Sequence, residues 1–396
     1  MSDTRKTTKP NVPNLRFPGF SGEWASRRIG EDCTVNMCKR IFANQTSEQG
    51  DVPFFKIGTI GGTPDAYITR DLFEEYKAKY NYPHEGEVMI TCAGTVGKTI
   101  VFDGEDAYFQ DSNIVWLSNP KQLYINSFLN YVLSRVNWNI LNSTTITRIY
   151  NDNLRELVIN YPSIKEQEKI VALLSLLDRR IAIQNKVIEK YESLIKALTD
   201  KIVDDLLKGR MVPFNQMYIQ AGEGGTPSTS VGQYYLNGTI PFVKIDDLSS
   251  KYLVKNKDFI NDLGLSKSSA WLIPSNSVIY SNGATIGAIS INTYPVSTKQ
   301  GILGVVPAAD VNTEYLYYLM CSRYFSEQVQ RIIAEGTMKT AYLKDMNKIQ
   351  CPLPSLREQK RIVAGLSALS SKLESELAAL LSYESIKRYL LINLFI

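Results

Sequence analysis

The chain has 396 residues, a length that favours two or three separately packed domains over a single one. Apolar residues make up 44% and charged residues 21%, which is typical of a folded globular protein and excludes extensive disorder. The formal net charge of +4 permits binding to nucleic acid but does not require it.

The composition also narrows the cellular compartment and the chemistry. The first ten residues are polar and charged, and no apolar run of about 18 residues follows, so we expect no signal peptide, no membrane span and a cytoplasmic protein. The five cysteines form no CxxC pair, which favours reduced structural thiols over disulfides or a thiolate zinc site. Because His84 is the only histidine, catalytic and metal sites built on histidine are nearly excluded.

The chain contains an internal repeat, in which short motifs return in the same order. VPFFKI at 52–57 returns as IPFVKI 188 residues later. MITCAGTVG at 89–97 returns as IYSNGATIG 190 residues later. YPSIKEQEKIVALLS at 161–175 returns as LPSLREQKRIVAGLS 192 residues later. This ordered series indicates two copies of one structural unit.

The first part of each copy predicts a mixed α/β domain. Short runs of β-branched and aromatic residues, bounded by glycine, proline, asparagine and aspartate, are typical of strands and turns. We expect a short helix in each domain, around Phe128–Asn142 and around Tyr315–Ala334. The N-terminal RFPGFSGEW at 16–24 has no clear second copy.

The second part of each copy predicts a long helix. Each begins after a proline with the capping-box spacing, at Ser163 and Glu166 and again at Ser355 and Glu358. Residues then recur at alternating steps of four and three, as in a coiled-coil seam. The seam residues are Ile170, Leu174, Leu177, Ile181, Gln184, Ile188, Tyr191, Ile195, Leu198 and Ile202, and Ile362, Leu366, Leu369, Leu373, Glu376, Leu380, Tyr383, Lys387, Leu390 and Leu394.

We expect the two long helices to pack on each other as a paired coil. The alternative is that each helix packs only on its own domain. A helix of about 45 residues extends roughly 68 Å, which is too long for one small domain to cover.

Residues 94–99 resemble part of a P-loop. The complete pattern requires glycine where Cys92 stands, and the second copy has Ala288 in place of the lysine at position 98. The feature that both copies keep is a glycine, Gly97 and Gly287, so the pattern predicts a tight turn rather than a phosphate site.

Asp65, Glu75 and Lys77 have the spacing of a PD…ExK nuclease motif, in which carboxylates hold Mg²⁺. Those carboxylates would have to meet on adjacent strands, whereas residues 71–83 predict helix or loop. A PD-ExK-type nuclease therefore remains only as an alternative. The chain also lacks the Asp/Asn-Pro-Pro-aromatic loop expected of a DNA adenine methyltransferase, so we predict no catalytic residue and no metal site.

Two different α/β halves, each followed by a Pro-Ser-x-x-Glu-Gln helix with matched heptads, resemble the specificity subunit of a type I restriction-modification system. The resemblance covers almost the whole chain. Its specific marks are NLRFPGFSGEW at 14–24, GGTPS at 224–228, Lys-Ile after each Pro-Phe strand, and PSxxEQ beginning at Pro162 and Pro354.

The resemblance implies an α+β fold, with two pseudo-repeated α/β target-recognition domains separated by two long helices that form an antiparallel coiled coil. The expected N-terminal recognition domain spans residues 1–162, and the second spans 211–354. The first conserved spacer helix spans 163–210, and the second spans 355–396.

The resemblance also implies a DNA-binding protein that is not itself an enzyme. Each domain would recognise one half of a bipartite, asymmetric site and so direct adenine methylation and restriction by partner subunits. The expected partners are double-stranded DNA, two methyltransferase subunits and motor-nuclease subunits. S-adenosylmethionine, ATP and Mg²⁺ would belong to those subunits, with no cofactor in this chain. The alternative is a protein-binding function, in which the chain is a coiled-coil adaptor. The affinity of such an adaptor would not fall steeply with salt concentration, as the affinity of phosphate contacts does.

The expected DNA contacts are polar and basic side chains in the loops before the long helices and near the predicted turns. They are Lys39, Arg40, Lys56, Lys98, Thr145, Thr147, Arg148, Tyr150, Lys244, Thr337, Lys339, Thr340 and Tyr342.

Overall fold

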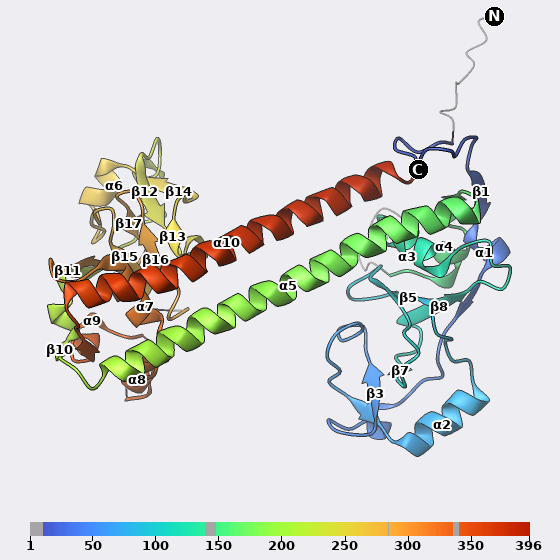
Figure 1. Ribbon diagram of the computed structural model, residues 1–396, viewed down its shortest axis with the longest axis horizontal. Helices are drawn as coiled ribbons and strands as arrows, with labels where there is room; N and C mark the ends of the chain where they lie inside the picture. The colour runs from blue at the N-terminus through green and yellow to red at the C-terminus, as the bar shows by residue number, and fades with distance from the viewer. Residues whose placement is uncertain (1–10, 139–147, 284, 336–339) are drawn as a thin grey trace, which may run out of the picture. The chain divides into compact units, whose positions relative to one another are not determined.

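The computed structural model describes residues 11–138, 148–283, 285–335 and 340–396. The chain divides into two compact units, one formed by Met1–Ile183 with Leu380–Ile396 and the other by Gln184–Ala379. We call these unit 1 and unit 2. Each contains one α/β domain and a segment of both long helices, α5 (Ile164–Leu206) and α10 (Leu356–Asn393) (Figure 1).

The domain of unit 1 contains three small sheets, with strand orders β2-β8-β5-β6, β4-β3-β7 and β1-β9. Its strands are β1 (Ala25–Arg28), β2 (Thr34–Asn36), β3 (Val52–Phe55), β4 (Tyr67–Ile68), β5 (Val88–Thr91), β6 (Thr99–Val101), β7 (Tyr108–Phe109), β8 (Ile114–Ser118) and β9 (Val158–Tyr161). Its helices are α1 (Ile29–Asp32), the 3₁₀ turn η1 (Ala43–Gln45), α2 (Arg70–Lys79), α3 (Asn126–Ser134) and α4 (Asn151–Arg155).

Unit 2 repeats this arrangement, with strand orders β11-β18-β15-β16-β13, β14-β12-β17 and β10-β19. Its strands are β10 (Met211–Pro213), β11 (Tyr218–Glu223), β12 (Ile240–Val243), β13 (Tyr252–Leu253), β14 (Asp258–Ile260), β15 (Val278–Ser281), β16 (Ile289–Asn292), β17 (Ser297–Thr298), β18 (Ile302–Pro307) and β19 (Gln350–Pro352). Its helices are η2 (Phe214–Gln216), η3 (Gly232–Tyr234), η4 (Ile245–Asp247), α6 (Asp262–Ser266), α7 (Thr313–Cys321), α8 (Arg323–Glu335) and α9 (Leu343–Met346).

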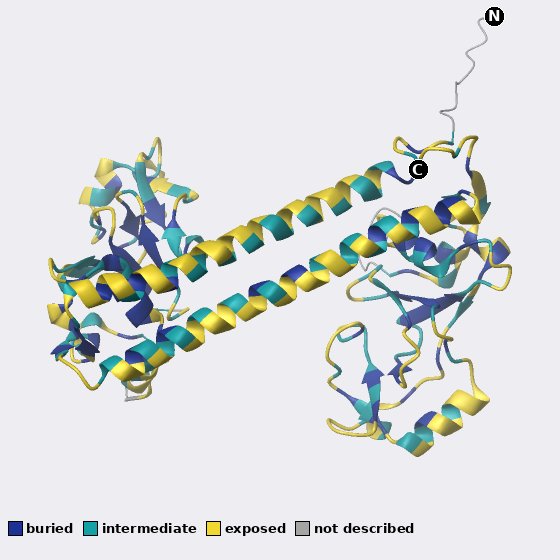
Figure 2. Cartoon of the chain, in the orientation of Figure 1, coloured by how far each residue is buried: buried dark blue, intermediate teal, exposed yellow. Residues whose placement is uncertain are grey.

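The register of the strands matches between the units. Strand β3 pairs in parallel with β7 and antiparallel with β4, and β12 pairs in parallel with β17 and antiparallel with β14. Phe54 lies opposite Tyr108 in the first parallel pair, and Phe242 lies opposite Ser297 in the second. The internal repeat predicted from sequence is therefore a repeat of topology. Buried residues, coloured dark blue, are frequent in the sheets of each domain (Figure 2).

The short helices differ from the prediction. Helix α3 ends at Ser134, before the predicted end at Asn142, and residues 139–147 lie outside the described residues. The second predicted helix is two helices, α7 and α8, which meet at Ser322. The extended backbone of Ser322 ends α7, and its hydroxyl accepts the Phe325 N–H at 3.2 Å, which caps the start of α8.

The glutamine that both PSxxEQ motifs share fixes the first turn of each long helix to its own domain. Gln167 is fully buried, and its carbonyl accepts the Ile125 N–H at 2.8 Å while its amide donates to the Leu123 and Pro162 carbonyls. Gln359 is equally buried and binds the Asn312 N–H at 2.7 Å and the Asp310 and Pro354 carbonyls in the same way. Each glutamine therefore connects the long helix to the residues that precede α3 or α7.

The glutamate of the same motif has different partners in the two copies. In unit 2, Glu358 forms the predicted capping box, since its carboxylate accepts the Ser355 N–H at 2.9 Å and the Ser355 hydroxyl at 2.7 Å. In unit 1, the buried Glu166 instead receives two hydrogen bonds of 2.8 Å from the Arg16 guanidinium. The difference arises because Arg16 belongs to the N-terminal segment, which has no second copy.

That N-terminal segment also encloses the end of α10 in unit 1. The Leu15 N–H donates to the Asn393 carbonyl at 2.8 Å. The Trp24 ring lies 6.1 Å from that of Phe128 and 6.4 Å from that of Phe395. The RFPGFSGEW motif therefore has a structural role in the core of unit 1.

Within each unit, the segments of α5 and α10 pack along the predicted seam. All ten predicted seam positions of each copy are buried or half-buried. In unit 1, Asp178 pairs with Lys387 at 2.5 Å, and Arg180 donates to the Tyr383 hydroxyl at 3.1 Å. Because the residue number rises along α5 as it falls along α10, the segments run antiparallel. The predicted fold class, two α/β domains with two long helices, is confirmed.

The predicted domain boundaries at residues 162, 210 and 354 stay predictions, because the contact-based units divide both long helices. In the part of the chain that the structure describes, every helix is too short or too polar to cross a membrane.

Candidate nucleic-acid interface

Five segments of unit 1 meet where the parallel strands β3 and β7 end. We call residues 38–40, 56–57, 92–97, 110–113 and 148–150 the recognition edge of unit 1. Backbone hydrogen bonds join these segments: the Ile149 N–H donates to the Cys92 carbonyl at 2.8 Å, and the Cys92 N–H donates to the Asn113 carbonyl at 2.7 Å. The Ile57 N–H donates to the Gln110 side chain at 3.3 Å.

Two arginines predicted as DNA contacts converge on one loop of this edge. The Arg40 guanidinium pairs with the Asp111 carboxylate at 2.8 Å, and Arg148 donates to the Ser112 carbonyl at 3.1 Å. Arg148 also lies 5.9 Å from the ring of Tyr150, which is 59% exposed. The edge therefore presents fixed cationic groups beside an exposed aromatic ring, a combination suited to phosphate and base contacts.

Unit 2 has the same edge, which we define as residues 224–228, 244–245, 281–283, 299–301 and 340–342. The Ala341 N–H donates to the Asn282 carbonyl at 3.0 Å, as Ile149 does to Cys92 in unit 1. The Asn282 N–H donates in turn to the Gly301 carbonyl at 3.0 Å. The two edges therefore share a backbone frame but present different side chains.

The two predicted lysines that follow the Pro-Phe strands occupy equivalent places. Lys56 pairs with Asp65 at 3.1 Å, and Lys244 pairs with Asp258 at 2.9 Å. Both lysine side chains are more than 40% exposed. They therefore stay accessible to a phosphate group.

The other two predicted lysines have partners away from this edge. The Lys98 ammonium donates to the Ile60 carbonyl at 2.5 Å, and the residue remains exposed. The Lys39 ammonium lies 5.3 Å from the centre of the Tyr80 ring. Lys39 also lines a groove of about 400 Å³ with Asn36, Asn81 and Asn151, beside the recognition edge.

The loops before the short helices α4 and α9 contain the remaining predicted contacts. Tyr342 precedes α9 as Tyr150 precedes α4, and the Lys344 ammonium lies 5.7 Å from its ring. Thr340 is half-buried beside it. The predicted contacts Thr145, Thr147, Thr337 and Lys339 lie outside the described residues.

The glycines at 97 and 287 form the tight turns predicted in place of a P-loop. Both have positive φ angles, +82° and +98°, which favour glycine. A Cβ atom on Gly97 would lie 2.0 Å from the Trp138 ring, so close packing also excludes a side chain there. The Thr91 hydroxyl accepts the Lys98 N–H at 3.0 Å and completes the turn.

The residues of the PD…ExK pattern do not form a carboxylate pair on adjacent strands. Asp65 pairs with Lys56, whereas Glu75 and Lys77 both lie on helix α2. Glu75 pairs with Lys79 at 2.8 Å, and Lys77 pairs with Asp106 at 3.1 Å. The described residues contain no group of three potential metal ligands.

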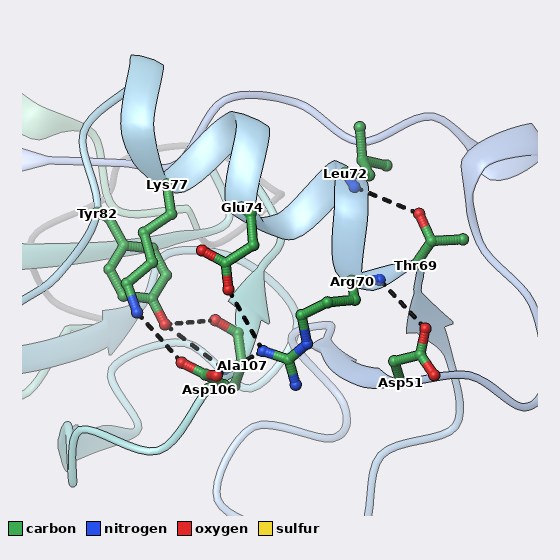
Figure 3. Close-up of polar contacts among 9 residues, drawn as sticks. All are labelled: Asp51, Thr69, Arg70, Leu72, Glu74, Lys77, Tyr82, Asp106 and Ala107. Carbon is green, nitrogen blue, oxygen red and sulfur yellow. Dashed lines mark hydrogen bonds and ion pairs between the residues drawn. The ribbon is translucent and has the colours of Figure 1, made fainter.

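The contacts of α2 explain its position instead (Figure 3). The Thr69 hydroxyl accepts the Leu72 N–H at 3.3 Å and caps the helix. Arg70 and Lys77 both pair with Asp106, and their hydrogen bonds lower the pKa of that carboxyl group. These charges anchor α2 to the strand that follows Asp106.

Sequence reasoning missed the loop between strands β7 and β8 and its counterpart between β17 and β18. The Gln110 N–H donates to the Phe55 carbonyl, and the Lys299 N–H donates to the Val243 carbonyl, so Gln110 and Lys299 are equivalent. The available signal was a further match of the repeat, in which YFQDSNI at 108–114 aligns with STKQGI at 297–302 with one residue fewer.

Comparison with known proteins identifies the family. The sequence pattern of the type I restriction modification DNA specificity domain matches residues 21–193 and 219–382. A putative type I restriction enzyme specificity subunit of Haemophilus influenzae is 48% identical over 172 residues, 43% of this chain and 41% of that protein. The MjaX putative specificity subunit of Methanocaldococcus jannaschii is 22% identical over 391 residues, 89% of this chain and 88% of that protein.

The alignment with the Haemophilus protein, and one with the MjaIX specificity subunit of M. jannaschii, span only 41% and 36% of those proteins. A crystal structure of the type I restriction-modification S subunit from M. genitalium shares the fold, with a TM-score of 0.61 at 19% identity over 97% of this chain and 99% of that chain. A second structure, from a study of type I system assembly and conformational transition, gives a TM-score of 0.55 at 16% identity over 96% and 98%. From its two matched domains and this fold, the chain belongs to the family of type I restriction-modification DNA specificity subunits.

Proposed function

We propose that each unit recognises one half of a bipartite, asymmetric DNA site through its recognition edge. One observation carries this proposal: the two edges have the same backbone frame and different side chains. Arg40, Asp111 and Arg148 meet in unit 1, whereas Lys299 and Gln300 occupy the equivalent loop in unit 2. Equivalent frames fit equivalent positions on a duplex, and different side chains fit different base sequences.

In this proposal the chain catalyses nothing itself. It binds double-stranded DNA and directs two methyltransferase subunits, which methylate adenine, and motor-nuclease subunits, which cut DNA. S-adenosylmethionine, ATP and Mg²⁺ bind to those partners. Support for a docking role comes from the long helices, which keep apolar side chains such as Leu176 and Leu381 exposed on faces that the seam does not use.

The test is a domain exchange followed by methylome sequencing. Residues 211–354 are replaced by the equivalent segment of another specificity subunit, in cells that contain the partner subunits. We expect one half of the methylated site to change and the other half to stay the same. Exchange of residues 1–162 is the matched control and should change the opposite half. A change in both halves from either exchange would contradict the assignment of one half-site to each domain.

A separate measurement tests DNA binding itself. The affinity of the assembled complex for its site should fall steeply as salt concentration rises, because phosphate contacts release counterions. An affinity that does not depend on salt would favour a protein adaptor and overturn the proposal.

A further inference from the structure

The backbone of the loop at residues 299–301 is held in place by hydrogen bonds to neighbouring segments of unit 2. All three backbone N–H groups have acceptors: Lys299 donates to the Val243 carbonyl, Gln300 to the Thr226 hydroxyl and Gly301 to the Glu223 carboxylate. Gly301 has a φ of +85°, which favours glycine and turns the chain into β18. The backbone of the loop is therefore fixed on both sides.

The two side chains at its tip are left free by these contacts. Lys299 and Gln300 are exposed, and neither side chain has a polar partner within the described residues. This differs from the other lysine of the edge, Lys244, whose charge is balanced by Asp258. A fixed backbone that holds unpaired polar side chains toward solvent favours a recognition contact, because the side chains are free to bind and the backbone loses little further entropy when the partner binds.

Unit 1 uses the equivalent loop differently. The Gln110 carbonyl accepts the Ile57 N–H, and the Asp111 carboxylate is bound by Arg40. Both side chains at the tip are therefore satisfied by neighbours in unit 1. At the equivalent loop of the repeat, Gln110 and Asp111 therefore have hydrogen-bonding partners in unit 1. The side chains of Lys299 and Gln300 have no such partners within the described residues of unit 2.

The chemistry of the free pair indicates what it binds. A lysine ammonium donates hydrogen bonds to the O6 and N7 acceptors of guanine, and a glutamine amide pairs with N6 and N7 of adenine in the major groove. We propose that Lys299 and Gln300 determine specificity in the half-site of unit 2, with Lys299 recognising a guanine and Gln300 an adenine. This inference rests on the proposed function and names the residues that carry it in one unit.

The experiment uses the complete complex with its methyltransferase partners and compares Lys299→Ala and Gln300→Ala with the unaltered chain. Methylome sequencing gives the recognised site, and binding to DNA of that site gives the affinity. Each variant should lose the requirement for one purine in one half-site and bind the original site about 5- to 150-fold more weakly. The other half-site should keep its full sequence.

The control is Lys267→Ala, at an exposed lysine that follows α6 in the same unit. Helix α6 follows strand β14, whose last residue, Ile260, lies opposite Ile240 at the start of β12. Lys244 follows the other end of β12, so α6 begins away from the recognition edge. This variant should keep both the recognised site and the affinity. Thermal unfolding of all three variants should match the unaltered chain, since the side chains are exposed.

Two results would overturn the inference. In the first, the unaltered complex methylates a bipartite site, and both variants keep that site and the original affinity. This result would contradict the inference and leave the proposed function intact. Weaker binding with an unchanged site would show that the residues contact phosphate only, which also contradicts it. If the unaltered complex methylates no specific site, the proposed function fails, and this inference fails with it.

Discussion

The Gln184 amide on α5 donates hydrogen bonds to both the side-chain carboxylate and the backbone carbonyl of Glu376 on α10, at 2.5 and 3.0 Å. Gln184 is 2% exposed, and the Glu376 side chain is 17% exposed and also pairs with Lys372 at 2.7 Å. These two residues are the polar break that the heptad pattern places 192 positions apart. A polar pair inside an apolar seam specifies register, because any shift leaves it without partners.

The first prediction concerns this pair. Gln184→Leu should lower the free energy of unfolding by about 1–3 kcal/mol, because the Glu376 carboxylate loses a hydrogen bond in a partly buried position. The double variant Gln184→Leu/Glu376→Leu should recover most of the loss, since two apolar residues pack in the seam. Chemical denaturation of the unaltered chain, Gln184→Leu, Glu376→Leu and the double variant measures the coupling. Equal losses that simply add would show that the two residues act independently.

The second prediction is that the paired helices set the gap between the half-sites. Because α5 and α10 run antiparallel, a heptad inserted between Val187 and Ile188 must be matched by one between Lys372 and Leu373. Both points lie at the same level beyond the Gln184–Glu376 pair. Each insertion adds about 10 Å of helix, which corresponds to up to about three base pairs. Methylome sequencing should show the same half-sites with more unspecified bases between them, or no methylation.

The matched control inserts one heptad in α5 alone. This change breaks the register of the seam and should destabilise the protein without producing a new ordered gap. Full methylation with an unchanged gap in the doubly lengthened protein would show that the helices do not set the distance.

The repeat and the seam were predictable because both depend on local sequence patterns. Matched motifs at nearly constant spacing predicted a duplicated topology, and the heptad steps predicted which side of α5 and α10 is covered. The turn at Gly97 was predictable for the same reason, since the second copy keeps Gly287 but not the lysine. These features require no knowledge of distant partners.

Features that depend on distant contacts were not predictable. The sequence suggests a capping box at Glu166, but Arg16 approaches from a segment 150 residues away and takes its place. The hydrogen bond from the Lys98 ammonium to the Ile60 carbonyl likewise joins residues 38 positions apart, and no local sequence pattern indicates it. Lys299 and Gln300 stand out only once strand pairing shows that they are the equivalents, in unit 2, of Gln110 and Asp111 in unit 1.

The third prediction concerns the buried glutamines of the PSxxEQ motifs. Gln359→Met should lower the free energy of unfolding by about 1–3 kcal/mol, because the Asn312 N–H and the Asp310 and Pro354 carbonyls lose the hydrogen bonds that they make with the buried glutamine. Gln167→Met should have a similar effect in unit 1. The exposed neighbour Lys360 provides the control, and Lys360→Ala should leave stability almost unchanged. If Gln359→Met is as stable as that control, these hydrogen bonds do not anchor the helix.

The fourth prediction is a pH dependence from an ion pair in unit 2. The Lys251 ammonium pairs with the Glu314 carboxylate and donates to the Tyr318 and Ser367 hydroxyls. Burial alone would raise the pKa of Glu314, but hydrogen bonds from Lys251 and Ser367 lower it overall. Burial likewise opposes the charge of Lys251, but the hydrogen bonds to Glu314 and Tyr318 raise its pKa overall.

The sign follows from these shifts. Because the pKa of Glu314 is lowered in the folded protein, its charge contributes fully to stability at pH values above the ordinary glutamate pKa. That contribution is lost as the pH falls through the pKa of Glu314 in the folded protein. A raised pKa makes the Lys251 contribution present below the ordinary lysine pKa and lost only at strongly alkaline pH. Glu314→Gln should therefore cost about 1–3 kcal/mol between about pH 6 and 9, and this difference should shrink below about pH 4. A difference that persists unchanged at about pH 3 would show that the charge of Glu314 is not what stabilises the fold.

The fifth prediction separates phosphate contacts from base contacts at the recognition edges. Lys56 and Lys244 occupy equivalent places, and each pairs with a carboxylate while remaining exposed, so a DNA phosphate can compete for the ammonium group. Lys56→Ala and Lys244→Ala should each weaken binding by a similar factor for cognate and altered sites and reduce the slope of log affinity against log salt by about 1. The recognised sequence should stay the same in both variants, unlike in Lys299→Ala. Binding measured at several salt concentrations, with DNA carrying a changed base in either half-site, gives both quantities. A changed sequence preference in Lys56→Ala or Lys244→Ala would assign these lysines to base recognition instead.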